Sequence, residues 1–392
     1  MCISWVRSAI VVLLGLTALP CCATPQNAGC DATAIFASVN GRLQSRNYEA
    51  AARALDELHQ CPHLSAIQTF QMGWLYGRAR HFNTALKIFH SVSEDVPDRL
   101  THRYAIALSQ FELADYQGAA DTLKDLPPGT LDAKCANLLA VSYSKLGLYR
   151  EAYAVLTRET QKDPHDLSAF LNLITVCAES GSFDQAAKVA SEATRLFPQS
   201  SEVFVVKGAV NILLGHLDEA YSDFSTAVHL DPARPDTRFF LALTDYKQGK
   251  FSDAVTVLQA ANKEGLVDSD LHYLLAECLL KVNVNDTASA MAELNHAIDL
   301  NGNSVSARTL RGRLLLETGH PKEAVTDLEI ASHRDPESRS ANYNLARAYR
   351  ALGKTDQARL LFQRLRGQTA DTLTALSDQK LNDALAGKGA HR

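Results

Sequence analysis

The chain has 392 residues, of which 46% are hydrophobic and 21% are charged, so its composition is that of a folded protein. Its 12 prolines and 20 glycines are too few for a collagen-like or low-complexity chain. The formal net charge of −5 argues against a nucleic-acid-binding protein, because such a protein needs a basic face to neutralise phosphates.

Residues 1–23 have the pattern of a secretory signal peptide. A basic residue precedes an uncharged apolar run, and Pro20 and small residues follow it. We expect cleavage near Ala23 and an exported protein, either periplasmic or secreted. The alternative is a lipoprotein signal in which Cys21 or Cys22 is lipidated, and Pro20 argues against it. The run is shorter than the roughly 20 residues of a transmembrane helix, and we expect no membrane span elsewhere.

The cysteines beyond this segment are odd in number and scattered, so they do not form a zinc-binding pattern. Disulfides persist in exported proteins. Cys30 and Cys61 stand at the two ends of the first predicted helical hairpin, and an antiparallel hairpin brings its ends together. A Cys30–Cys61 bridge is one interpretation, and two unpaired thiols are the other. Cys135, Cys177 and Cys278 fall at helix positions typical of small buried residues.

After a short predicted linker at 24–31, a repeat of about 34 residues extends over 32–370. Apolar residues recur every three or four positions, which predicts two amphipathic helices in each unit. Three ladders of equally spaced small residues mark the repeat: Gly181, Gly215 and Gly249; Ala186, Ala220 and Ala254; Ala193, Ala227 and Ala261.

These residues resemble the tetratricopeptide repeat, whose pattern reads Trp-x2-Leu-Gly-x2-Tyr, then Gly, then Ala-x3-Phe, then Ala and Pro. The resemblance covers 32–370 in about ten units. It implies an exported, bacterial-type member of this family with an all-α fold, a right-handed superhelical solenoid of helix-turn-helix hairpins. The pattern is fullest at Phe204, Gly208, Gly215, Ala220, Phe224, Ala227 and Pro232.

Each repeat position has a physical reason. Gly215 falls where the first helix ends, and a left-handed backbone is easiest for glycine. Ala220 lies where the second helix crosses the first, and Phe224 fills the space beside it. Since one hairpin has too little apolar surface to fold alone, stacking of neighbours supplies the core.

The C-terminal residues 371–386 are predicted to form a capping helix that covers the final hairpin. Residues 387–392 are expected to fray. The predicted helix carries leucines on one side, at Leu373, Leu376, Leu381 and Leu385.

In this family the first helices of successive units line a concave groove, and the resemblance implies that the groove binds a protein or peptide. Aromatic rings there would serve as anchors. The charge changes from acidic at Asp236, Asp270 and Glu277 to basic toward the C-terminus, so an acidic peptide could lie against the arginines. The groove residues implied are Phe70, Trp74, Tyr104, Phe111, Phe239, Tyr246, Tyr273, Arg313, Tyr343, Arg347 and Arg350.

Two alternatives stay open for this set. Aromatic residues at helical spacing are also typical of a core. The arginines could be solvated, or paired with Glu317 and Asp335.

No nucleophile elbow, zinc-binding His-Glu-x-x-His pair or phosphate-binding loop appears in the sequence. His59, Cys61 and His63 lack the fourth donor that a metal site needs. We therefore expect no enzyme, cofactor or metal, but a scaffold or adaptor of the cell envelope or periplasm that binds a protein or peptide. The alternative is a substrate-handling subunit of an envelope enzyme or secretion complex.

Overall fold

The computed structural model consists of α-helices joined by short turns. It describes residues 31–59, 61, 64–126, 131–365 and 372–385, within which there are 21 helices and no strand. The all-α prediction is therefore confirmed. The predicted signal peptide, nearly all of the predicted linker and the predicted frayed tail lie outside the described residues.

The chain forms two compact units, of which the first covers 1–182. Neighbouring helices pair as hairpins, α2 with α3, α4 with α5, α6 with α7 and α8 with α9. The helices of this unit are α2 (Ala32–Gln44), α3 (Tyr48–His59), α4 (Ala66–Arg78), α5 (Phe82–Ser91), α6 (Arg99–Glu112), α7 (Tyr116–Lys124), α8 (Ala133–Lys145), α9 (Tyr149–Lys162) and α10 (Leu167–Glu179).

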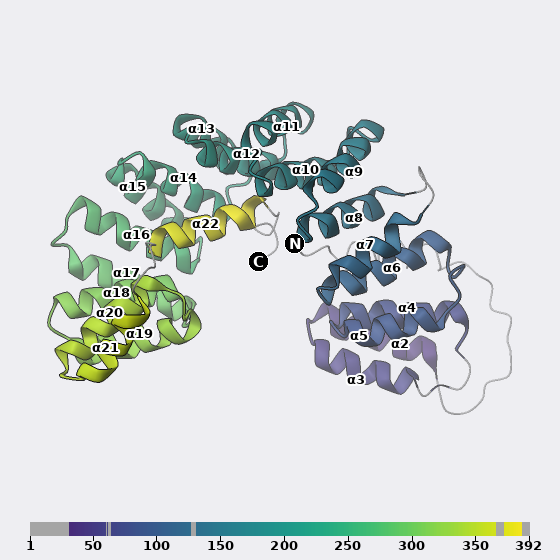
Figure 1. The fold of residues 1–392 in the computed structure, drawn as a ribbon, viewed down its shortest axis with the longest axis horizontal. Helices are drawn as coiled ribbons and strands as arrows, with labels where there is room; N and C mark the ends of the chain where they lie inside the picture. The colour runs from purple at the N-terminus through teal and green to yellow at the C-terminus, as the bar shows by residue number, and fades with distance from the viewer. Residues whose placement is uncertain (1–30, 60, 62–63, 127–130, 366–371, 386–392) are drawn as a thin grey trace. The chain divides into compact units, whose positions relative to one another are not determined.

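The second unit covers 183–392 and repeats the same arrangement. Its hairpins are α12 with α13, α14 with α15, α16 with α17, α18 with α19 and α20 with α21, and each hairpin packs on the next (Figure 1). The helices are α11 (Phe183–Leu196), α12 (Ser201–Leu214), α13 (Leu217–Leu230), α14 (Pro235–Lys247), α15 (Phe251–Lys263), α16 (Ser269–Val282), α17 (Thr287–Leu300), α18 (Val305–Glu317), α19 (Pro321–Arg334), α20 (Arg339–Ala351), α21 (Thr355–Arg364) and α22 (Thr372–Leu385).

Residues at the repeat positions make these hairpins tight. Gly215 ends α12 with φ of 79°, the left-handed conformation that glycine adopts most easily. Ala220 on α13 is fully buried, and a Cβ placed on Gly208 of α12 would come within 2.8 Å of the Phe224 ring. The two helices of the hairpin therefore meet through a small residue on one side and an aromatic ring on the other.

The C-terminal helix α22 confirms the predicted helix but not its predicted neighbour. Its main contacts are with α12 and α18, which belong to earlier hairpins, rather than with the final hairpin (Figure 1, yellow). In this position Leu381 and Leu385 are buried, and Lys380 forms an ion pair with Asp270 of α16. Leu373 was also predicted to lie on the apolar side of this helix, but its side chain is outside the part of the chain that the structure describes.

A helix that spans a bilayer needs about 20 predominantly apolar residues. None of the described helices is both long enough and apolar enough to cross a membrane.

Candidate functional site

Four helices of the second unit present a common surface to α22. The helix packs on α12 and α18 (Figure 1). Its Lys380 reaches side chains of α14 and α16. Each of these four is the first helix of its hairpin, the class to which the tetratricopeptide resemblance assigns the groove. We call the side of α12, α14, α16 and α18 that contacts α22 the inner face.

Lys380 is the polar anchor of α22 on the inner face. Its Nζ lies 2.8 Å from Asp270 Oδ2 and 4.6 Å from the centroid of the Phe239 ring. The two charged side chains are only 15% and 22% exposed, so solvent screens their attraction less than on an open surface. One ammonium group thus interacts with a carboxylate of α16 and with a ring face of α14.

Apolar side chains supply the rest of the contact. Leu376, Leu381 and Leu385 are at most 9% exposed, whereas Gln379 and Asn382 are exposed. These three leucines are spaced five and four residues apart, so they lie along one side of the helix. α22 is therefore an amphipathic helix whose apolar side lies against the protein.

A second surface lies on α20 and α21, beyond the helices that α22 contacts. Tyr343 is 48% exposed and meets Phe362 edge-on at 6.0 Å between ring centroids. The guanidinium carbon of Arg347 lies 5.9 Å from the Tyr343 ring centroid, and that of Arg350 lies 5.9 Å from the Phe362 centroid. We call Tyr343, Arg347, Arg350 and Phe362 the α20 patch.

The two arginines of the α20 patch keep N–H donors for an acidic ligand. Arg347 Nη1 donates to Asn344 Oδ1 at 3.1 Å, and within the described part of the chain neither arginine forms an ion pair with a carboxylate. A planar guanidinium held over an aromatic ring keeps its outward N–H donors for a carboxylate partner. Arg313, predicted to belong with them, instead approaches Glu317 at 4.0 Å, as its alternative interpretation anticipated.

The predicted groove aromatics of the first unit pack against one another. The Phe70 ring lies 5.1 Å from that of Phe89 and 6.4 Å from that of Trp74, and Trp74 lies 6.2 Å from Tyr104. All are nearly fully buried. This packing agrees with the alternative that they are core residues.

The remaining predicted residues have mixed surroundings. Phe111 is buried beside Tyr116, with ring centroids 5.1 Å apart, and Tyr246 is half-buried. Tyr273 is fully buried, and its hydroxyl donates to Glu277 Oε1 at 3.1 Å. Phe239 is fully buried, and the Lys380 ammonium lies over its ring.

The structure thus groups Tyr343, Arg347 and Arg350 in one exposed patch and places Phe239 beneath α22. Sequence reasoning missed Lys380 and Phe362. Phe362 occupies the aromatic position of the repeat, a signal that could have identified it. Lys380 stands beside Leu381 on the apolar side of the predicted helix, which is an unusual place for a lysine.

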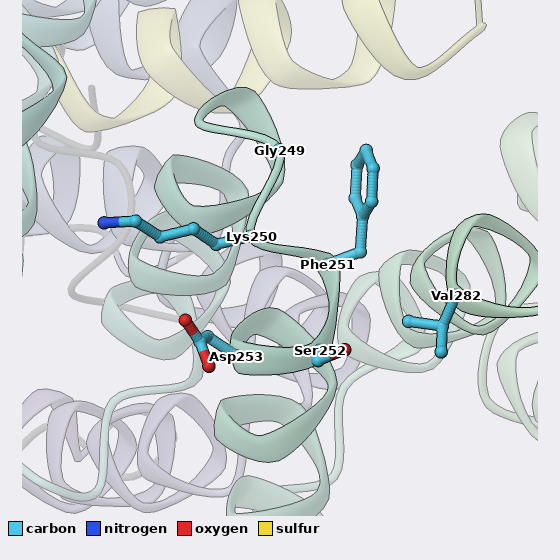
Figure 2. A pocket seen from close by; sticks show the side chains of 6 residues that line it. All are labelled: Gly249, Lys250, Phe251, Ser252, Asp253 and Val282. Carbon is cyan, nitrogen blue, oxygen red and sulfur yellow. The ribbon is translucent and has the colours of Figure 1, made fainter.

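One hollow opens where α14 turns into α15 (Figure 2). It has a volume of about 220 Å³, below the roughly 300–1,000 Å³ of ligand pockets. The side chains of Lys250, Phe251 and Val282 point in different directions instead of converging on one point (Figure 2). The hollow therefore lacks the enclosing shape of a small-molecule site.

Asp245 on α14 is a buried carboxylate with an unusual proton affinity. It is 2% exposed, and within the described residues its Oδ2 has no hydrogen-bond partner. Burial raises its pKa to about 6, with a further contribution from the negative charge of Asp253, while Lys250 opposes the shift. Because its burial disfavours the charged form, we treat Asp245 as a determinant of stability.

The cysteines offer no reactive thiolate in the described regions. Cys177 and Cys278 are free and buried, and burial raises their pKa values to about 11 and about 12, so both stay protonated near neutral pH. Cys135 is also free and buried, and its pKa is raised by burial. Cys61 is disulfide-bonded, but Cys30 lies outside the described residues, so the Cys30–Cys61 pairing stays a prediction.

A metal site needs several donor side chains close together. The described residues contain no group of three or more His, Cys, Asp or Glu side chains able to hold a metal ion. His63, one member of the cluster considered from the sequence, lies outside them.

Comparison with known proteins identifies the family of this chain. The family model of the cilia and flagella-associated protein 70 C-terminal domain matches residues 99–342, and a tetratricopeptide-repeat model matches 315–378. The mitochondrial import receptor subunit TOM70 of Saccharomyces cerevisiae is 24% identical over 293 residues, which cover 70% of this chain and 47% of that protein. The TPR repeat-containing protein YpiA of Bacillus subtilis is 22% identical over 233 residues, which cover 57% and 53%.

The chain spans about half the length of these curated relatives. Among solved structures, a tetratricopeptide repeat protein from Parabacteroides merdae matches with a TM-score of 0.50 and 17% identity, covering 64% of this chain and 98% of that one. This likeness supports the fold alone. Because the first family model covers more than half of the sequence, the chain belongs to the tetratricopeptide-repeat family of the cilia and flagella-associated protein 70 C-terminal domain.

Proposed function

We propose that this chain is a non-catalytic scaffold whose second unit binds a partner protein and whose α20 patch holds an acidic segment of that partner. Tetratricopeptide-repeat proteins bind proteins and peptides, which is the coarser statement that family membership supports. The α20 patch supports the more specific statement that the bound segment is acidic. Arg347 and Arg350 lie over aromatic rings and, within the described residues, have no carboxylate partner.

The chemistry of the patch favours a carboxylate-bearing peptide. Stacking on Tyr343 and Phe362 restricts the guanidinium groups, so less conformational entropy is lost when they bind. Each guanidinium can donate two parallel hydrogen bonds to one carboxylate. The exposed Tyr343 ring adds apolar contact area next to these donors.

The cellular setting belongs to the same proposal. Residues 1–23 support export, which would place the scaffold in the periplasm or outside the cell, within an assembly of the envelope. The relative TOM70 is a mitochondrial import receptor subunit, and an adaptor role for this chain agrees with that likeness. A chain retained in the cytoplasm with residues 1–23 intact would contradict this part of the proposal.

Peptide binding by the full chain tests the α20 patch. The probe is a labelled peptide of alternating glutamate and glycine residues with one tyrosine, and its affinity is measured by fluorescence anisotropy. Losing one charged hydrogen-bond partner costs about 1.5–3 kcal/mol, so Arg347→Ala combined with Arg350→Ala should weaken binding by at least about tenfold. The affinity of the wild-type chain should also fall as salt rises.

The control is Arg359→Ala on α21, which removes an equally charged residue whose side chain is 71% exposed and paired with Asp356. It should leave peptide affinity within about twofold, since exposed pairs contribute little. Equal losses in both variants would indicate nonspecific attraction and would reject the α20 patch as the binding site.

A further inference from the structure

We infer that α22 is a built-in, displaceable ligand of the inner face, and that the inner face binds an amphipathic helix of a partner protein with a lysine in the place of Lys380. This inference rests on the proposed scaffold function, since both require the second unit to bind a protein. It adds a second surface with a different ligand chemistry from that of the α20 patch.

The contacts of α22 define the kind of helix that the inner face binds. Leu376, Leu381 and Leu385 are buried on one side, while Gln379 and Asn382 on the other side are exposed. The inner face therefore already holds an amphipathic helix by its apolar side, with Lys380 as the one polar anchor. Laying an amphipathic helix into an apolar surface is a common mode of peptide recognition, and the anchors recur at helical spacing.

Charge on the inner face specifies the lysine. Asp236 has its own cation, with Arg234 Nη2 2.6 Å from its Oδ2, and Glu277 accepts a hydrogen bond from Tyr273. Asp270 instead obtains its cation from α22. A partly buried carboxylate is costly to leave unpaired, so any helix that replaces α22 binds better when it brings an ammonium group to the same place.

The Phe239 ring also favours a lysine at this position of the bound helix. The Lys380 ammonium lies 4.6 Å from the ring centroid, within the range of a cation–π contact. A carboxylate in this position would face both the negative ring face and Asp270. The site thus discriminates between helices by the charge of one residue.

Two properties make α22 exchangeable. Its 14 residues are about the length at which an isolated helix is marginal in water. Thr372, Thr374 and Asn382 have low helix propensity, so the helix depends on the inner face for its stability. Leaving the face is therefore coupled to unfolding of the helix, and a partner helix can take over the same contacts.

Because α22 is tethered, it competes at a high effective concentration, on the order of millimolar for a short linker. A partner helix must bind the face more tightly than α22 does, or α22 must be weakened first. The tether thus sets a threshold that weakly matching helices do not pass.

Weakening the contact of α22 with the inner face, in the full chain, tests whether another helix can replace α22. The probe is a labelled synthetic peptide with the sequence of residues 372–385, and the variant carries Lys380→Ala with Leu381→Ala. The peptide should bind the variant at least about tenfold more tightly than the wild type, because the chain's own helix no longer competes effectively. The control Gln379→Ala with Asn382→Ala alters only exposed positions of α22 and should behave like the wild type.

A charge reversal at Asp270 tests whether the peptide binds at the inner face. Adding Asp270→Lys to the weakened variant should abolish binding of the native peptide. A peptide in which the lysine equivalent to Lys380 is replaced by glutamate should then bind this chain but not the one that retains Asp270. Rescue of this kind would not follow from a merely structural role of Asp270.

Three outcomes would overturn the inference. One is a weakened variant that binds no peptide although α14 and α16 keep their hydrogen-exchange protection. Another is loss of that protection in the milder Lys380→Ala variant, which would make α22 a fixed structural element. The last is a dimer formed by exchange of α22, because the occupant would then be a second copy. Binding of the acidic peptide to the α20 patch should be unchanged by Asp270→Lys, so failure here and failure of the proposed function are distinguishable.

Discussion

Gly208 and Phe224 illustrate how one residue of the repeat constrains its neighbour. A methyl group at Gly208 would approach three atoms of the Phe224 ring to within 3.0 Å, and that ring also stacks on Phe240 with centroids 5.2 Å apart. The ring has little room to retreat. Sequence spacing predicted these positions because the steric requirement recurs in every hairpin of the pattern.

Asp245, in contrast to Gly208 and Phe224, is not predicted by any position of the repeat pattern. Its folded-state pKa of about 6 lies above the roughly 3.9 expected in an unfolded chain. The folded protein therefore binds this proton more tightly than the unfolded chain does. The contribution of Asp245 to stability is complete below about pH 4 and is lost as pH rises to about 6.

We predict that Asp245→Asn raises the free energy of unfolding of the second unit at pH 7, by up to about 3 kcal/mol for two units of pKa. The amide stays neutral, so the cost of burying a charge disappears. Near pH 4 the variant and the wild type should differ little. Urea unfolding at both pH values checks this, and an equal difference at the two pH values would contradict it. Asp356→Asn, at a side chain 87% exposed, is the control.

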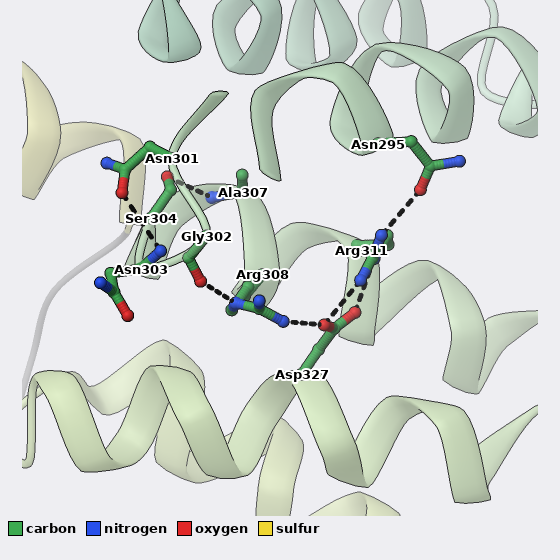
Figure 3. A network of polar contacts seen from close by, with 9 residues as sticks. All are labelled: Asn295, Asn301, Gly302, Asn303, Ser304, Ala307, Arg308, Arg311 and Asp327. Atoms are coloured by element: carbon green, nitrogen blue, oxygen red, sulfur yellow. Dashed lines mark hydrogen bonds and ion pairs between the residues drawn. The ribbon is translucent and has the colours of Figure 1, made fainter. Parts of the chain in front are cut away.

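At the scale of the elements, one carboxylate joins two helices and a turn (Figure 3). Asp327 of α19 accepts hydrogen bonds from Arg308 Nη1 and Arg311 Nε of α18, both at 2.6 Å. Arg308 also donates to the Gly302 carbonyl, and Arg311 to the Asn295 side chain on α17. The network fixes α18 relative to both of its neighbours, and no spacing rule of the repeat predicts it.

We predict that Asp327→Ala destabilises the second unit by about 3 kcal/mol, because it leaves two partly buried guanidinium groups without their counter-ion. The Arg308 and Arg311 side chains are 12% and 22% exposed, and Asp327 is 3% exposed. Denaturant unfolding gives the measurement.

The matched control for this prediction is Asp356→Ala on α21. Its pair with Arg359 is exposed on both sides and should contribute no more than about 1 kcal/mol. Similar losses in the two variants would show that burial does not strengthen the network.

The helix α22 shows what spacing alone can predict about an element. Its leucines predicted a helix with one apolar side, and the structure contains that helix. The pattern could not identify the surface it covers, because the apolar side of a helix can pack on the end of a solenoid or on the inner face. Lys380 decides between them, since Asp270 lies on the inner face.

For the whole molecule, the repeat predicted the fold class and the order of the hairpins. The candidate site was predicted only in part. Tyr343, Arg347 and Arg350 came from positions in the repeat and are at least partly exposed together, whereas Phe70 and Trp74 came from equivalent positions and are buried. Helical periodicity identifies the side of a helix that faces inward, but it does not show whether another side chain already covers that side.

Stability in such a chain should be local, because each hairpin contacts mainly its neighbours. One buried apolar cluster lies within the first unit and includes Phe89 and Leu138, while another lies within the second unit and includes Leu328 and Leu345. Leu328 is fully buried and fills the space above Gly312. A cavity at Leu328 should therefore weaken the helices around it without affecting the first unit.

We predict that Leu328→Ala costs about 2–5 kcal/mol locally and speeds amide hydrogen exchange in α18 to α21 by at least about thirtyfold. Exchange in α4 to α6 should stay within experimental error of the wild type. Leu360→Ala, at a side chain that is 53% exposed, should leave both regions unchanged. Exchange measured by mass spectrometry over peptides of each helix distinguishes the outcomes. A uniform increase along the chain would mean that the units unfold as one cooperative body, contrary to nearest-neighbour stacking.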